Sequence, residues 1–426
     1  MKYAAVVAML GLAAALILLP ATEPEAPGAA PGANVPPVAI CPIVQVGDRS
    51  TAISVLSSVN GEGRLSSFAA GQTTGSVEFR TGGSGAVTVA AADSDAVGIA
   101  GALVEMPSDT TAAASVITGP EARAAESCAD EPPARAFISG GTTVRDSFFE
   151  IQLINPYAGE ATVDLLVSSE NGVESDDRFN AVTVPALSTI TRDLTQIIPG
   201  RERISVSVES TRGSVIAFGR QTIGDEVAMW RAVAPAQDWW LPVPPGGAIK
   251  QMVVASPEAG EIEYQVDLYG PEGFVEGHDV GIISSRGTVT VPLAAVTEDA
   301  AGVRVISTGP VVPALRMESA EGLAWTTASD VTAPVWLLPG ASAPAGGAGT
   351  VVILNGGIEA VTVTIKTLTD TALTRSLEVA AEDVLVVTLV AADGYRVEAT
   401  GPVVALWTSR SGAAASAAIG IPLQDG

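Results

Sequence analysis

The chain has 426 residues, of which 16% are charged and 4% are aromatic, and its formal net charge is −25 at pH 7. A surface this acidic repels the phosphates of DNA and RNA, so nucleic acid is excluded as a partner. The chain holds 1 histidine, which removes His-based catalytic triads and His-rich zinc sites from consideration.

Residues 1–22 read as an export signal. Lys2 precedes an uncharged apolar run, Tyr3 to Leu19, which is typical of a signal peptide or, at the short end of the length range, of a membrane-spanning signal anchor. No small-x-small cleavage site is clear after the run, so we favour the uncleaved anchor. The positive charge of Lys2 keeps the short N-terminal end in the cytoplasm. The rest of the chain is therefore predicted to be extracytoplasmic, either secreted or held at the cytoplasmic membrane by this segment alone.

Residues 23–40 are rich in proline, alanine and glycine and predict an extended tether without a core of its own. The chain has 2 cysteines, Cys41 and Cys128. An even number of cysteines in an exported chain favours a structural disulfide, and no Cys-x-x-Cys spacing points to redox or metal chemistry.

A repeat of about a hundred residues organises the chain. Its copies contain a Gly-Gly lead-in, an alternating strand that runs into a turn, and a Thr-Gly-Pro-like turn before an apolar strand; the alternating strands are IQLINP, MVVASP and VVILNG, beginning at Ile151, Met252 and Val351. The first copy keeps the pattern and loses most signature residues. This spacing matches one β-sandwich domain per copy.

Seven short strand signals in the last copy predict an all-β fold, a tandem array of immunoglobulin-like or fibronectin-like β-sandwiches. A propeller is the competing fold, but each copy is too long for a single blade. The predicted domains are residues 41–133 (divergent and closed by the disulfide), 134–240, 241–336 and 337–426. We expect proteolysis near 131–141, 242–247 and 339–347.

Tryptophans recur near the junctions between copies, where buried aromatic side chains would make the array rigid. Trp240 and Trp336 open matching lead-ins. Trp239 points away from its neighbour in any extended strand, so we expect it to be the exposed aromatic residue at a binding surface.

Candidates for chemistry are weak. His278 follows Gly277 in a turn-rich stretch and reads as a solvated loop residue. Asp93 and Asp95 place hard oxygen ligands on one loop and are the candidates for calcium, although the spacing matches no EF-hand. We expect no catalytic residues and no cofactor.

Several short motifs resemble an uncharacterised family of large secreted actinobacterial proteins, known only as a domain of unknown function with tandem β-sandwich repeats. The similarity rests on the W-L-P lead-ins at Trp240 and Trp336, Asn155-Pro156, the Val184-Pro185-Ala186 turn, and Gly-Pro-Val-Val at Gly309 and Gly401. It covers residues 41–423. The resemblance implies an envelope-facing protein with a membrane anchor and no known activity.

The sequence therefore predicts a non-enzymatic scaffold in the cell envelope, with an envelope protein or glycan as its partner. A more specific form of this hypothesis, which rests on the resemblance alone, is that the scaffold supports the assembly of envelope glycans. A carbohydrate-binding or adhesion protein is the alternative, with Trp239 and Tyr269 or Tyr395 as stacking faces. A remote third hypothesis is a glycoside hydrolase that uses a pair of acids.

Overall fold

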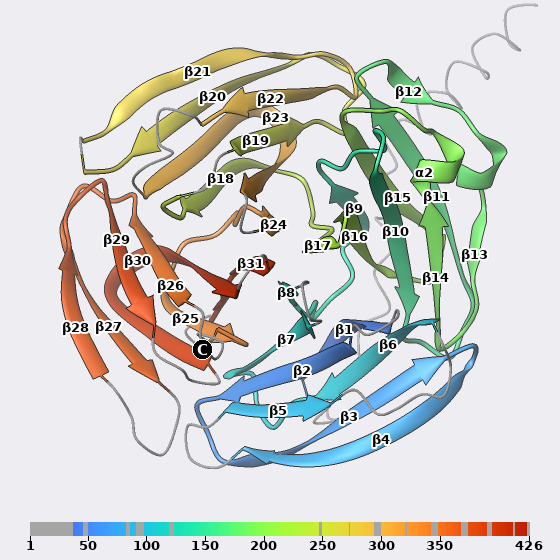
Figure 1. Ribbon diagram of the computed structural model, residues 1–426, viewed down its shortest axis with the longest axis horizontal. Helices are drawn as coiled ribbons and strands as arrows, with labels where there is room; N and C mark the ends of the chain where they lie inside the picture. The colour runs from blue at the N-terminus through green and yellow to red at the C-terminus, as the bar shows by residue number, and fades with distance from the viewer. Residues whose placement is uncertain are drawn as a thin grey trace, which may run out of the picture. The chain divides into compact units, whose positions relative to one another are not determined.

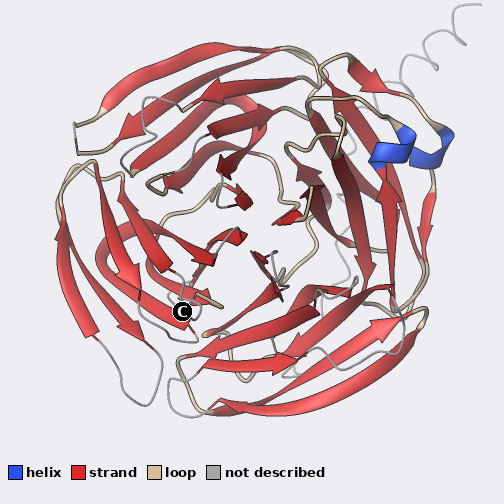
Figure 2. Ribbon diagram, viewed as in Figure 1, coloured by secondary structure: helices blue, strands red, loops and turns tan. Residues whose placement is uncertain are grey.

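Strands form wherever apolar and polar residues alternate. In β27 (Val361–Thr367), the valines and the isoleucine are buried while the residues between them are exposed or half-buried. The computed structural model is almost entirely strand, as Figure 2 shows. It describes residues 37–45, 50–81, 86–90, 98–118, 123–246, 249–271, 273–293, 300–319, 322–341, 348–367, 374–389, 394–411 and 414–423.

The strands fall into four units. The first unit contains β1 (Val38–Gln45), β2 (Ser50–Ser57), β3 (Gly61–Ala69), β4 (Gln72–Thr81), β5 (Ala86–Ala90), β6 (Gly98–Glu105), β7 (Thr111–Thr118) and β8 (Arg123–Ser127). The second contains β9 (Arg135–Ile138), β10 (Ser147–Asn155), β11 (Ala161–Ser169), β12 (Gly172–Glu174), η1 (Asp177–Phe179), β13 (Val182–Val184), β14 (Ser188–Asp193), α2 (Leu194–Ile197), β15 (Ile204–Arg212), β16 (Ile216–Ile223) and β17 (Glu226–Arg231).

The third and fourth units each contain one long strand that runs through both of their sheets. The third has β18 (Ala236–Val243), β19 (Ile249–Ala255), β20 (Ile262–Tyr269), β21 (Val275–Ile283), β22 (Thr288–Pro292), the long β23 (Ala301–Ser319) and β24 (Gly322–Thr327). The fourth has β25 (Ala333–Pro339), β26 (Ala348–Asn355), β27, β28 (Thr374–Val379), β29 (Asp383–Leu389), the long β30 (Gly394–Ser411), β31 (Ala414–Ile419) and β32 (Ile421–Pro422).

Every unit is a sandwich of two antiparallel sheets with the same strand order. The sheet that holds a unit's first strand, here called the A-sheet, runs β4-β3-β6-β1, β12-β11-β15-β9, β21-β20-β23-β18 and β28-β27-β30-β25. The other, the B-sheet, runs β5-β2-β7-β8, β14-β10-β16-β17, β22-β19-β23-β24 and β29-β26-β30-β31. The all-β fold class of stacked β-sandwiches is thus confirmed, and the degraded first copy keeps the full topology of the others.

The units pack on one another through a repeated contact between a glycine and a large aliphatic side chain. Gly101 of the first unit would place a Cβ 2.8 Å from Ile154 of the second, and Gly302 of the third would place one 2.2 Å from Leu354 of the fourth. The fourth unit returns to the first, because a Cβ on Gly394 would lie 2.8 Å from Leu56. At these three of the four junctions, the A-sheet therefore leaves room for a side chain from the next B-sheet.

This contact closes a ring within Pro36–Gly426, which behaves as one compact unit. Strand β8 lies against β17, β17 against β24, β24 against β31, and β31 returns to β8. Figure 1 shows these four strands nearest the centre of the ring. Buried clusters cross the junctions, so Leu56 and Ala112 of the first unit pack with Leu337 and Leu423 of the fourth. The array is a closed circle rather than a rod.

The structure moves three of the expected boundaries. Residues 38–40 of the expected tether belong to β1, which pairs with β6. Trp240 and Trp336 lie inside β18 and β25, so each opens its unit and does not close or border the preceding domain. The strand pattern did not reveal this, because the lead-in looked like a linker rich in proline and glycine. The segment 1–22 and residues 23–36 lie outside the described residues; in the described part of the chain no helix is long and apolar enough to span a membrane.

The predicted disulfide is confirmed. Cys41 on β1 and Cys128, directly after β8, are bonded, with their Cα atoms 4.6 Å apart and 87 residues apart in sequence. Both side chains are buried in the core of the first unit. The bond therefore joins the two sheets of the unit that has drifted furthest in sequence.

Candidate functional sites

The aromatic residue chosen as the exposed binding residue is in fact buried. Trp239 is 1% exposed, and its Nε1 donates hydrogen bonds to the carbonyl oxygens of Ala236 (3.0 Å) and Val311 (2.8 Å). Trp336 makes the same two bonds to Ala333 and Val403. Trp239, and not Trp240, is thus the counterpart of Trp336. Because two tryptophans are adjacent here, aligning the two copies by their sequence matched Trp240 to Trp336, one residue away from the true counterpart.

The other proposed stacking faces are also covered, since Tyr269 and Tyr395 are 4% and 2% exposed. Trp240, the neighbour of Trp239, is half-buried. The Arg304 guanidinium lies 4.5 Å from its ring centroid, and Tyr269 packs at 5.7 Å on the same ring. A Cβ on Gly356 of the fourth unit would lie 2.0 Å from the Trp240 ring. Trp240 therefore fastens the third unit to the fourth.

The calcium candidates Asp93 and Asp95 lie outside the described residues. Within the described ranges, no group of three or more histidine, cysteine, aspartate or glutamate residues is placed to hold a metal ion. His278, expected in a loop, lies on β21 and is half-buried.

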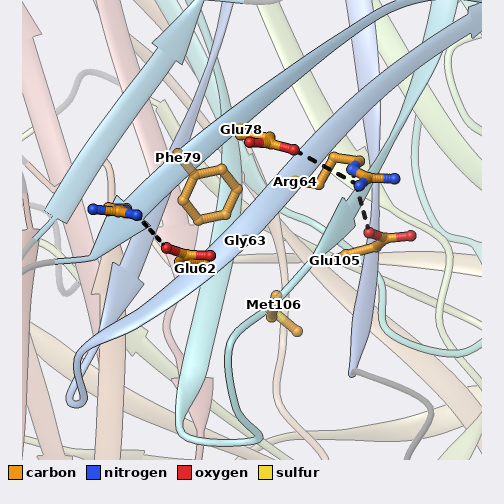
Figure 3. Close-up of a pocket in the computed structure, with 8 residues that line it drawn as sticks. Glu62, Gly63, Arg64, Glu78, Phe79, Glu105 and Met106 are labelled. Atoms are coloured by element: carbon orange, nitrogen blue, oxygen red, sulfur yellow. Dashed lines mark ion pairs between the residues drawn. The ribbon is translucent and has the colours of Figure 1, made fainter.

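A pocket of about 520 Å³ lies at the A-sheet of the first unit. Figure 3 shows Phe79 and Met106 between the charged side chains that line it. Arg64 pairs with Glu78 at 3.8 Å and with Glu105 at 3.9 Å, and Arg80 pairs with Glu62. Glu62 and Glu78 are largely exposed and Glu105 is half-buried, and ion pairs this open to solvent contribute little to stability.

A second cavity, of about 440 Å³, lies between the second and third units. The second unit contributes the loop after β9 and the two residues just before β15, and the third contributes β19, β22, β23 and β24. Its lining includes Gly140, Arg203, Gln251, Arg316 and Trp325. Trp325 stacks on Trp230 across the junction, with ring centroids 4.6 Å apart and planes 12° apart. The expected aromatic packing between copies is thus present at this junction.

A buried ion pair lies within the B-sheet of the second unit, on the face that also carries Ile154, which packs against the first unit. Glu150 on β10 and Arg220 on β16 stand opposite each other, and the Arg220 Nη2 lies 2.6 Å from the Glu150 Oε1. Both side chains are nearly buried, at 5% and 10% exposure. Burial raises the pKa of Glu150, and Arg220 opposes the rise. The sequence did not indicate this pair, because FFEIQLIN reads as an ordinary strand with one charge.

Glu126 is another buried carboxylate that the sequence did not indicate. It lies on β8 near the ring centre and accepts hydrogen bonds from the backbone N–H of Ser127 (2.8 Å) and of Arg231 on β17 (3.1 Å). Burial raises the pKa of Glu126 to about 7, and the charge of Arg231 acts in the opposite direction. The folded protein therefore holds a proton here that the unfolded chain, with a pKa of 4.5, would release.

The free energy of unfolding should consequently fall as the pH rises from the unfolded-state pKa of Glu126, 4.5, through its folded-state pKa of about 7. Between the unfolded and folded pKa values the loss is about 3 kcal/mol, at about 1.4 kcal/mol per pKa unit. Glu126→Gln mimics the protonated carboxyl and cannot ionise. Its melting temperature should therefore rise relative to that of the native protein between about pH 5 and about pH 8. Glu131→Gln, at an exposed position, serves as the control. Parallel pH profiles for the native protein and Glu126→Gln would rule out this account.

One family model matches the chain, described as a family of unknown function (DUF5719), over residues 86–322. That segment is more than half of the chain. The chain belongs to the DUF5719 family. The matched segment runs from β5 to the first residue of β24, so it includes the cavity between the second and third units apart from Trp325, and also strand β21.

No curated protein matches this DUF5719 chain. Among solved structures, it was matched to the crystal structure of a tetra-tandem repeat in the extending region of a large adhesion protein. The identity is 10%, the match covers 91% of this chain and 100% of the other, and the TM-score is 0.12. A score that low supports no inference about fold or function.

Proposed function

We propose that the protein is a non-enzymatic, extracytoplasmic scaffold of the cell envelope that presents a sheet edge to a protein partner. Supporting observations are the disulfide, which suits an oxidising compartment, and the closed ring, which holds its surfaces rigidly. The observation that carries the proposal is strand β21. It ends the A-sheet of the third unit and, among the described strands, pairs only with β20.

Strand β21 exposes large apolar side chains. Val280 is 65% exposed and Ile282 is 57% exposed, and the two residues lie on one face because side chains alternate along a strand. The intervening Gly281 lies against Tyr264 instead. Natural proteins normally protect such an edge, because its unpaired backbone groups can recruit another strand.

The other three A-sheet edges carry that protection. Strand β4 bears the exposed charged residues Glu78 and Arg80. Strand β28 bears exposed Arg375 and Glu378, and β12 is only 3 residues long. Strand β21 also bears an exposed charge, Glu276, but it differs from its counterparts in two large apolar side chains, Val280 and Ile282, that are more than half exposed and could pack against an added strand.

Charge indicates the kind of partner. Glu261, Glu263 and Glu276 are exposed on or beside the β20–β21 hairpin. The net charge of −25 also opposes pairing with a second copy of this chain. We therefore propose an extended segment of an envelope protein that alternates apolar and basic residues.

A short synthetic peptide that alternates valine and lysine should bind and protect the β21 amides from hydrogen exchange. Replacing Val280 and Ile282 with threonine keeps the β-branched shape but removes apolar contact, so affinity should fall by about tenfold or more. Val77→Thr on the edge strand β4 is the matched control and should bind normally. Equal binding of a valine–glutamate peptide, or protection at β4 or β28 in place of β21, would refute the proposal.

A further inference from the structure

The four units place chemically different residues at equivalent positions of their B-sheets. Glu150 lies four residues before Ile154, which packs against Gly101 of the preceding unit. The corresponding position before Ala255 in the third unit is Gln251, whose partner across the strands is Arg316. The cross-strand pair Glu150–Arg220 is thus replaced by Gln251–Arg316.

This replacement leaves Arg316 without a carboxylate on its neighbouring strand. Its Nη2 pairs with Glu318, two residues along the same strand, at 2.6 Å. Its Nε is buried and has no hydrogen-bond acceptor within the described part of the chain. The Nε of Arg220 is equally without an acceptor among the described residues, so the two arginines differ in the residue opposite: Arg220 faces the Glu150 carboxylate, and Arg316 faces the neutral Gln251.

The space beside Arg316 is the 440 Å³ cavity between the second and third units, which is large enough for a small ligand. Two further donors on its lining have no acceptor among the described residues, the Nε of Arg203 and the Nε1 of Trp325. Trp325 is 2% exposed, so its unpaired N–H is costly. By contrast, Trp230, on which Trp325 stacks, donates to the carbonyl oxygen of Ser139 at 3.0 Å.

The backbone around the cavity is shaped to keep it open. Gly140 has φ +82°, and a Cβ there would lie 2.4 Å from the Trp325 ring and 3.1 Å from its Nε1. Any other residue would be strained in this conformation and would press on the indole N–H. Glycine at this position leaves the N–H free to meet a ligand.

We propose that this cavity binds a small hydroxylated carboxylate, such as a sugar acid, whose carboxylate takes the place beside Arg316 that Glu150 occupies beside Arg220. Arginine pairs with carboxylates through charge-assisted hydrogen bonds, and the Trp325 N–H supplies a further donor. Glu202 and Thr290, which also line the cavity, can hydrogen-bond to ligand hydroxyl groups.

Calorimetric titration of the full chain with D-glucuronate tests the proposal, with the neutral methyl ester as a probe of the same shape. The native protein should bind glucuronate, bind the ester at least about tenfold more weakly, and show a shift of the Trp325 indole N–H resonance. Gln251→Glu should fold normally, because it reproduces the pair of the second unit, and should lose glucuronate binding by at least about tenfold, because its own carboxylate would occupy the place beside Arg316.

Gln196→Glu, which adds the same charge at an exposed position, should bind like the native protein. Equal affinity for glucuronate and its ester would overturn the role of the carboxylate. Undiminished binding by a folded Gln251→Glu variant, or no glucuronate binding by the native chain, would overturn the site. These outcomes are independent of peptide binding at β21.

Discussion

Replacing Cys41 and Cys128 with alanine should destabilise the first unit by about 4 to 5 kcal/mol. The disulfide closes a loop with a sequence separation of 87 residues, and cross-linking a loop of that length removes much of the conformational freedom of the unfolded chain. Because the bond joins the two sheets of one unit, hydrogen exchange should speed up first at β1 and β8. Thermal unfolding followed by exchange mass spectrometry measures both effects.

Reduction of the native protein provides the matched comparison. A reducing agent should lower its melting temperature toward that of the double alanine variant, which should itself be insensitive to the agent. Equal melting temperatures for the oxidised and reduced native protein would show that the bond contributes nothing. Faster exchange confined to the fourth unit would show that its effect is not local.

Removing one member of the buried Glu150–Arg220 pair of the second unit should cost about 3 to 5 kcal/mol. Arg220→Met leaves the Glu150 carboxylate buried against the first unit without its counter-ion. The double variant Glu150→Leu with Arg220→Met should recover most of the lost stability, since apolar side chains of similar volume can replace a buried ion pair. Chemical denaturation of the single and double variants measures the recovery.

Arg64→Met is the control for this experiment. It breaks the solvated pairs with Glu78 and Glu105, so the change should stay within about 1 kcal/mol. A double variant that is less stable than Arg220→Met alone would mean that the pair is not replaceable and that the charges position the two units.

The repeat and its strand content could be predicted from sequence because they depend on local patterns. Alternation such as Val361-Thr362-Val363 fixes a strand and its buried face within a few residues. The disulfide followed from the cysteine count. Trp239 was misplaced because two adjacent tryptophans satisfy either register of an alternating strand, and only the partners Ala236 and Val311 decide which one faces inward.

The closure of the ring and both interface sites could not be predicted, since they depend on residues distant in the chain. Gly394 and Leu56 are separated by most of the sequence, and neither carries a local signal that it packs on the other. That Glu150 and Gln251 occupy equivalent positions becomes clear only when the strands are aligned by their cross-strand partners, Arg220 and Arg316. Sequence repeats show that copies exist, but contacts between copies are set by packing.

The return contact from Gly394 to Leu56 has a consequence for how this protein can evolve. An open filament can gain or lose a module at either end with little penalty. Here a fifth copy would have to separate the first and fourth, and a missing copy would leave two unmatched faces in water. Within the ring, new properties must therefore come from divergence at equivalent positions, as Gln251 and Val280 illustrate.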